Sequence, residues 1–97
     1  MSVVSGVTLQ VADEGDAKLV RSLVDPWLEK NGYERLGDLG PGYRGSKHPQ
    51  IFVFGAGYNY FDDDGFADLI RTLTWSLPEC VVLLINPKEG ATKVVRP

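Results

Sequence analysis

The stretch QIFVFGAGYNYFDDDGF, residues 50 to 66, decides the fold of this chain. It opens with Gln50 to Phe54, an almost continuous apolar run that is typical of a central strand covered on both faces. Gly55, Gly57, several aromatic residues and an aspartate run at 62 to 64 follow before the next periodic apolar segment. We therefore predict that a strand passes into a helix here.

The chain downstream of this stretch predicts one helix and two further strands. Apolar residues recur at helical spacing until Pro78, which should end the helix; they are Phe66, Leu69, Ile70, Leu73 and Leu77. Cys80 to Ile85 predicts a second buried strand, and Asn86 to Gly90 a hairpin-like turn. Thr92 to Val95 then predicts a last strand.

The chain upstream predicts a strand followed by an amphipathic helix. Val7 to Val11 alternates apolar and polar residues, so one face of this strand should be buried. The helix that follows carries its apolar residues between Leu19 and Leu28 and ends at Asn31-Gly32. Pro26 removes a backbone hydrogen bond inside it, so we expect a kink, or a restart with Asp25 as the N-cap and Pro26 in the first turn.

These elements predict a single α/β (α+β) domain over residues 1 to 97. Residues 32 to 49 are rich in glycine and form the longest irregular segment, with a short edge strand expected near Tyr43. Two helices with one apolar stripe each must lie against a sheet, which favours a two-layer sandwich. We expect a mixed sheet of four to five strands with both helices on one face and ferredoxin-like topology. A small three-layer or barstar-like arrangement is the alternative.

The composition is that of an ordinary globular protein, with 43% hydrophobic and 24% charged residues. The net charge of −3 and the lack of a cluster of lysines and arginines argue against binding to nucleic acid. The longest uninterrupted apolar run, Val81 to Ile85, is too short to cross a bilayer, and the first residues lack the pattern of a signal peptide. We expect a cytoplasmic protein that does not contact membranes.

The glycines and aspartates of residues 50 to 66 do not match the motifs of a cofactor or metal site. The third glycine of a dinucleotide fingerprint that begins at Gly55 would fall at Tyr60. A calcium loop with Gly65 as its glycine would place Tyr60 at the first ligand position and Arg71 at the last. We expect the glycines to mark a strand end or bulge, and we expect no cofactor and no metal.

Catalysis by a thiol would have to use Cys80 and His48, the only cysteine and histidine in the chain. Spacing alone does not exclude this pair. Cys80, however, opens an apolar strand, where a small buried thiol is common. We therefore expect that the protein is not an enzyme and has no catalytic residues.

The turn after the central strand carries more aromatic and acidic residues than a helix cap requires. One aspartate caps the helix, and the others favour its positive end. Trp75 falls nearly opposite the apolar stripe of the second helix, so it is either an exposed anchor or, if the helix unwinds before Pro78, a cover for the core edge. The predicted partner-binding surface consists of Tyr58, Tyr60, Asp62, Asp63, Asp64, Asp68 and Trp75.

The segment from Gly57 to Phe66, followed by W-x-x-P-E at Trp75 to Glu79 and the strand Val81 to Ile85, resembles small acidic bacterial immunity proteins of toxin-immunity systems. The resemblance implies that the protein neutralises a toxin stoichiometrically, by occlusion rather than by chemistry. Such toxins are often nucleases with a basic cleft.

We therefore expect a small acidic protein-binding module, an immunity protein that occludes the active site of a basic toxin domain. One alternative is a structural or regulatory subunit that forms a homodimer through Thr92 to Val95 or through Trp75. Another is a ligand-binding or enzymatic domain in which a glycine-rich loop holds an anion through Tyr43, Arg44, Lys47 and His48.

Overall fold

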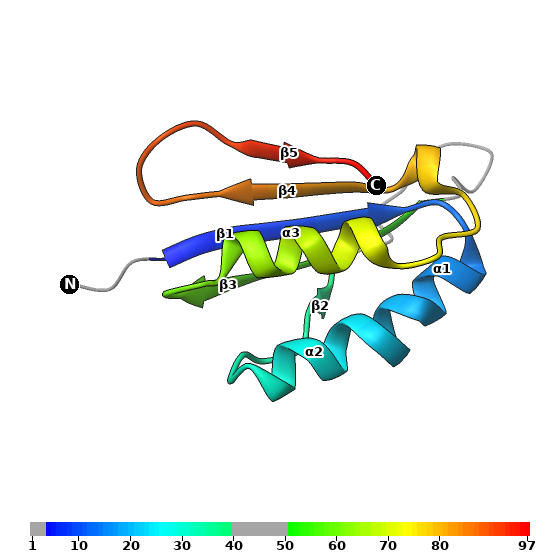
Figure 1. The fold of residues 1–97 in the computed structure, drawn as a ribbon, viewed down its shortest axis with the longest axis horizontal. Coiled ribbons are helices and arrows are strands. Elements are labelled where there is room, and N and C mark those ends of the chain that lie inside the picture. Colours follow the sequence, from blue (N-terminus) through cyan, green and yellow to red (C-terminus); the bar gives the residue numbers. More distant parts are fainter. Residues whose placement is uncertain (1–3, 40–50) are drawn as a thin grey trace.

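Five antiparallel strands form one open sheet in the computed structural model, which describes residues 4–39 and 51–97. The strands are β1 (Val4–Val11), β2 (Gly37–Asp38), β3 (Phe52–Asn59), β4 (Val82–Asn86) and β5 (Lys93–Val95). Their order across the sheet is β2-β3-β1-β4-β5, as Figure 1 shows. The central strand β1 pairs with β3 from Val4↔Asn59 to Val11↔Phe52 and with β4 on its other side.

The helices cover one face of this sheet (Figure 1). They are α1 (Glu14–Leu19), α2 (Asp25–Lys30) and α3 (Asp63–Thr72), with a π-helical turn at Val20–Val24 and a 3₁₀ turn at Pro78–Cys80. Burial alternates along β1, so that Val7, Leu9 and Val11 face the helices. In the described ranges, no helix is both long and apolar enough to cross a membrane.

The two-layer α+β sandwich is confirmed, and its connectivity is ferredoxin-like with β5 added beside β4. The sheet differs from the expected mixed one because all four strand pairs are antiparallel. Each helical crossover skips one position in the sheet. The skipped position is filled by a strand of opposite direction, β3 between β1 and β2 and β1 between β3 and β4.

The central part of residues 50 to 66 is a longer strand than the sequence predicts. β3 continues through Gly55 and Gly57, which therefore lie inside the strand and not at its end. It is also not covered on both faces throughout, since Gly57 and Asn59 are exposed, although Gly55 on the same face is buried. A Cβ added to Gly55 would lie 2.6 Å from Leu39 Cδ1 and 2.9 Å from the Val7 carbonyl oxygen, so a glycine is required where Leu39 crosses the strand.

The smaller boundary differences concern β2, β4 and β5. An edge strand does follow the first helix, but it lies at Gly37–Asp38; the expected position near Tyr43 is outside the described residues. The expected strand at Cys80 to Ile85 begins later, because Pro78–Cys80 forms a 3₁₀ turn first. β5 begins one residue after the expected start at Thr92.

Pro26 is accommodated by the π-helical turn. The Asp25 N–H donates to the Val20 carbonyl oxygen, one residue further back than in an α-helix, and Pro26 occupies the first turn of α2. The expected restart with Asp25 as N-cap is wrong, because Asp25 has helical backbone angles and no side chain caps α2. Its carboxylate is 1% exposed and bonds to Arg21 and Leu36.

The second helix ends at Thr72, so the prediction that it continues to Pro78 is wrong. Trp75 instead folds back onto the core, where it is 6% exposed and its indole N–H donates to the Ile70 carbonyl oxygen at 2.7 Å. Asp16 holds the unwound segment, because its carboxylate accepts from the N–H groups of Ser76 at 2.8 Å and Leu77 at 3.0 Å. This is the second of the two sequence-based alternatives for Trp75.

Replacing Asp16 with alanine should lower the free energy of unfolding by about 2 to 4 kcal/mol, because two backbone donors lose their acceptor in a largely buried site. Asp16→Asn, which retains one acceptor, should lie between this variant and the wild type. Urea unfolding measures the effect, with the exposed Glu14→Ala in the same turn as the control. Equal losses for Asp16→Ala and Glu14→Ala would show that this contact does not hold the segment.

Candidate functional site

The turn between β3 and α3 places an exposed tyrosine in an unusual backbone conformation. Tyr60 has φ 51° and is the only residue other than glycine with positive φ among the described residues. Tyr33 fixes the turn, since its hydroxyl donates to the Tyr60 carbonyl oxygen and accepts from the Asp62 N–H, both at 3.0 Å. Asp62 then caps α3, because its Oδ1 accepts from the Gly65 N–H at 3.0 Å.

A cluster of aromatic rings packs around Phe61 in this turn. Phe61 stacks on Tyr58 with ring centroids 4.9 Å apart and meets the Tyr33 ring edge-on at 4.9 Å. Phe66 continues the cluster to Trp27 on α2, at 5.3 Å from Phe61 and 5.5 Å from Trp27. The cluster joins α2, β3 and α3, so these ring contacts hold the turn against the rest of the domain.

Four residues of the predicted surface are exposed and lie around the start of α3. We call this set the Tyr60 corner; it consists of Tyr60, Asp62, Asp64 and Asp68. The Tyr60 residue is 68% exposed. The Asp68 side chain is 76% exposed and forms an ion pair with Arg71 at 3.5 Å. The corner therefore presents one aromatic ring and three carboxylates to solvent.

The Asp63 side chain is only partly exposed to solvent, and its role differs from that of Asp62 and Asp64. Its side chain is 19% exposed, and Oδ2 accepts from the Lys93 ammonium of β5 at 3.2 Å. The other oxygen, Oδ1, is buried and has no hydrogen-bond partner among the residues that the structure describes. Asp63 therefore ties α3 to the last strand and contributes little to the exposed charge.

Tyr58 and Trp75 do not belong to the exposed surface, which corrects the prediction. Tyr58 is 6% exposed and its hydroxyl donates to the Glu34 carbonyl oxygen at 2.6 Å. Two residues that are two positions apart in a regular strand lie on the same face, as Tyr58 and Tyr60 would if the strand continued. The positive φ of Tyr60 ends that alternation, so the two rings point in different directions.

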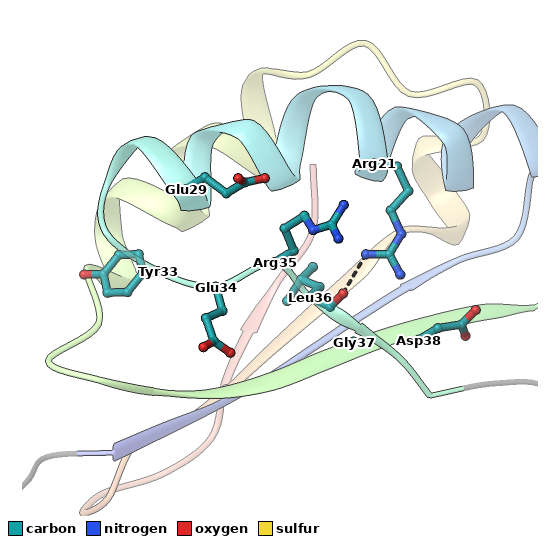
Figure 2. Close-up of a pocket in the computed structure, with 8 residues that line it drawn as sticks. All are labelled: Arg21, Glu29, Tyr33, Glu34, Arg35, Leu36, Gly37 and Asp38. Carbon is teal, nitrogen blue, oxygen red and sulfur yellow. Dashed lines mark hydrogen bonds between the residues drawn. The ribbon is translucent and has the colours of Figure 1, made fainter.

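A second feature, which the sequence did not predict, is a groove between the first helix and the segment that leads into β2 (Figure 2). It has a volume of about 880 Å³. Arg21 crosses it, with Nη1 2.9 Å from Asp25 Oδ2 and 2.6 Å from the Leu36 carbonyl oxygen. Asp25 Oδ1 accepts from the Leu36 N–H at 3.2 Å. The sequence feature that could have indicated this groove is an Arg–Asp pair four residues apart, next to a proline inside a helix.

The remaining predicted sites are not formed by the described residues. Tyr43, Arg44, Lys47 and His48, the expected anion-binding loop, lie outside those residues, so the Cys80–His48 pair has no described geometry. Residues 4–39 and 51–97 contain no group of three or more His, Cys, Asp or Glu side chains placed to hold a metal ion.

Tyr58 should make stability fall at alkaline pH. Burial, and then the charges of Asp25 and Glu34, raise the pKa of Tyr58 from 10.0 to about 12. The stabilising contribution is complete below pH 10 and is lost between pH 10 and about 12, because only the unfolded chain ionises there. Denaturant unfolding across this range should show a steeper decline for the wild type than for Tyr58→Phe. If the free energy of unfolding fell equally in both proteins, the Tyr58 hydroxyl would ionise as easily in the folded state as in the unfolded one.

Comparison of the chain with protein-family models, with curated proteins and with solved structures gave no match. The Tyr60 corner and the groove are therefore the observations from which a function can be inferred.

Proposed function

We propose that this protein is a small binding module that neutralises a basic protein, in the manner of an immunity protein, by covering the partner's active site with the Tyr60 corner. The observation that carries the proposal is Tyr60 itself. Its side chain is exposed although its backbone occupies a region that disfavours a bulky residue.

The backbone conformation of Tyr60 has a cost, which supports a role outside the fold. A residue with a side chain costs about 1 to 2 kcal/mol in the left-handed region, and glycine or asparagine would fit better. Strained residues that are exposed and firmly held occur often at binding sites. Tyrosine is also enriched among the few residues that dominate binding energy.

The turn that carries Tyr60 is already ordered, which favours tight binding. Tyr33 fixes the backbone on both sides of Tyr60, and the aromatic cluster fixes Tyr33. A partner therefore meets a surface that loses little conformational entropy when the complex forms. Occlusion of an active site requires this kind of rigid surface and no reactive group.

The charge around Tyr60 favours a basic partner. Asp62, Asp64 and Asp68 are exposed, and the chain has a net charge of −3. The start of α3 carries a partial positive charge, but the carboxylates outweigh it. Opposite charges across an interface raise the association rate and select against acidic partners. The resemblance of residues 57 to 85 to acidic immunity proteins supports the same class of partner.

Tyr60→Asn should weaken binding about tenfold or more, because asparagine tolerates the backbone conformation but lacks the ring. The measurement is calorimetric titration of the protein encoded by the neighbouring reading frame, with urea unfolding of both variants as the stability control. A basic partner whose affinity does not change with Tyr60→Asn would place the contact elsewhere. Absence of any complex with that protein would count against neutralisation.

The double variant Asp64→Asn/Asp68→Asn should slow association with the same partner, and the difference should shrink as salt screens the charges. Stopped-flow mixing at low and high ionic strength measures it. Glu79→Gln/Glu89→Gln, two exposed residues outside the corner, is the control with the same change in net charge. Equal slowing by both double variants would show that only the overall charge matters.

A further inference from the structure

Two hollows meet beneath the first helix, and Arg21 and Asp38 line both of them. The larger is the groove of Figure 2, which also contains Arg35. The smaller, of about 480 Å³, continues toward α1 and includes Phe52 and Phe54. One side of the combined space is therefore polar, with two arginines among its charged residues, and the other contains two aromatic residues.

Arg21 has donors left for a ligand. Its Nη1 donates to the Asp25 carboxylate and to the Leu36 carbonyl oxygen, while Nε and Nη2 make no hydrogen bond with the part of the chain that the structure describes. These two nitrogens form the edge of a guanidinium that binds a carboxylate through two parallel bonds. The side chain is 39% exposed, so this edge is accessible from the groove.

Arg35 supplies a second cation to the same groove. Its guanidinium makes no hydrogen bond or ion pair within residues 4–39 and 51–97, and the residue is exposed. Figure 2 shows its side chain extending from the segment before β2 toward the helix that carries Arg21. Two arginines that line one hollow, one of them without a partner among these residues, attract an anion.

The acidic residues of the groove limit the charge of that anion. Glu29, Glu34 and Asp38 also line it, so a ligand with two or more negative charges would be repelled. The aromatic hollow adds a second requirement. Phe52 is partly exposed there, which favours a ligand with an apolar arm. Phe54 is only 5% exposed, because the Arg21 guanidinium lies over its ring, with the guanidinium carbon 4.8 Å from the ring centre.

We propose that these two hollows form a binding site for an amphipathic monocarboxylate, with the carboxylate between Arg21 and Arg35 and the apolar arm against Phe52. This site lies beside β2 and does not include the Tyr60 corner, so it is independent of the proposed neutralisation. The same chemistry is offered by a free aryl or alkyl acid and by the C-terminal residue of a peptide.

Amide chemical-shift changes on titration with 3-phenylpropanoate test the site. The neutral 3-phenylpropanamide should bind about tenfold more weakly, because it loses charge-assisted bonds, and propanoate should also bind more weakly, because it lacks the ring. Shifts should concentrate at residues 17 to 22 and 34 to 38. Equal binding of acid and amide, stronger binding of inorganic phosphate, or no binding of the acid would overturn the proposal.

Arg35→Gln should weaken 3-phenylpropanoate binding about tenfold and leave the free energy of unfolding unchanged, since the side chain has no partner among the described residues. Arg96→Gln, beyond β5 at the opposite edge of the sheet, is the charge-matched control. Equal weakening by both variants would refute the site. Acetyl-Gly-Gly-Phe and its C-terminal amide identify the source, because a peptide that binds more tightly than the free acid indicates a protein C-terminus.

Discussion

The contact of Arg21 and Asp25 with the backbone of Leu36 is the constraint on which the rest of the structure depends. The Leu36 carbonyl oxygen accepts from the arginine, and its N–H donates to the carboxylate. The two side chains thus bond to the backbone directly before β2, on the side away from β3, as a neighbouring strand would. Fewer backbone groups at this edge of the sheet are therefore open to pairing with another chain. With Leu36 fixed, the Glu34 carbonyl oxygen is placed to accept from the Tyr58 hydroxyl. The Tyr33 hydroxyl is likewise placed to donate to the Tyr60 carbonyl oxygen in the turn before α3.

The π-helical turn and this contact occur at the same place in the helix. Pro26 has no N–H to give, so the regular ladder is already interrupted at this point. The widened turn resolves the interruption without ending the helix, and Arg21 and Asp25 lie within it or directly after it. Widened turns of this kind often occur at functional sites. Here the turn carries the arginine that shapes the groove.

Local patterns predicted the elements well, and long-range contacts account for the errors. The alternation of Val7 to Val11, the helical spacing of both apolar stripes and the capping aspartate, Asp62, could be predicted because each depends on neighbours in the sequence. The end of α3 could not, because it depends on a hydrogen bond from the Ser76 N–H to Asp16, 60 residues away in the sequence. In the candidate site, the prediction that the side chain is exposed is correct for Tyr60 and wrong for Tyr58. The left-handed backbone of Tyr60 ends the alternation of side chains along β3, so the two tyrosines do not share a face. The groove depends on a bond between residues 21 and 36, which no local periodicity reveals.

The position of β1 between β3 and β4 has a consequence for how the chain acquires its shape. Both ladder partners of β1 lie far along the sequence from it, at residues 52–59 and 82–86. The apolar face of β1 therefore stays uncovered until those residues have been synthesised. Pairing across such separations is slow compared with helix formation, so neither half of this molecule is an autonomous folding unit.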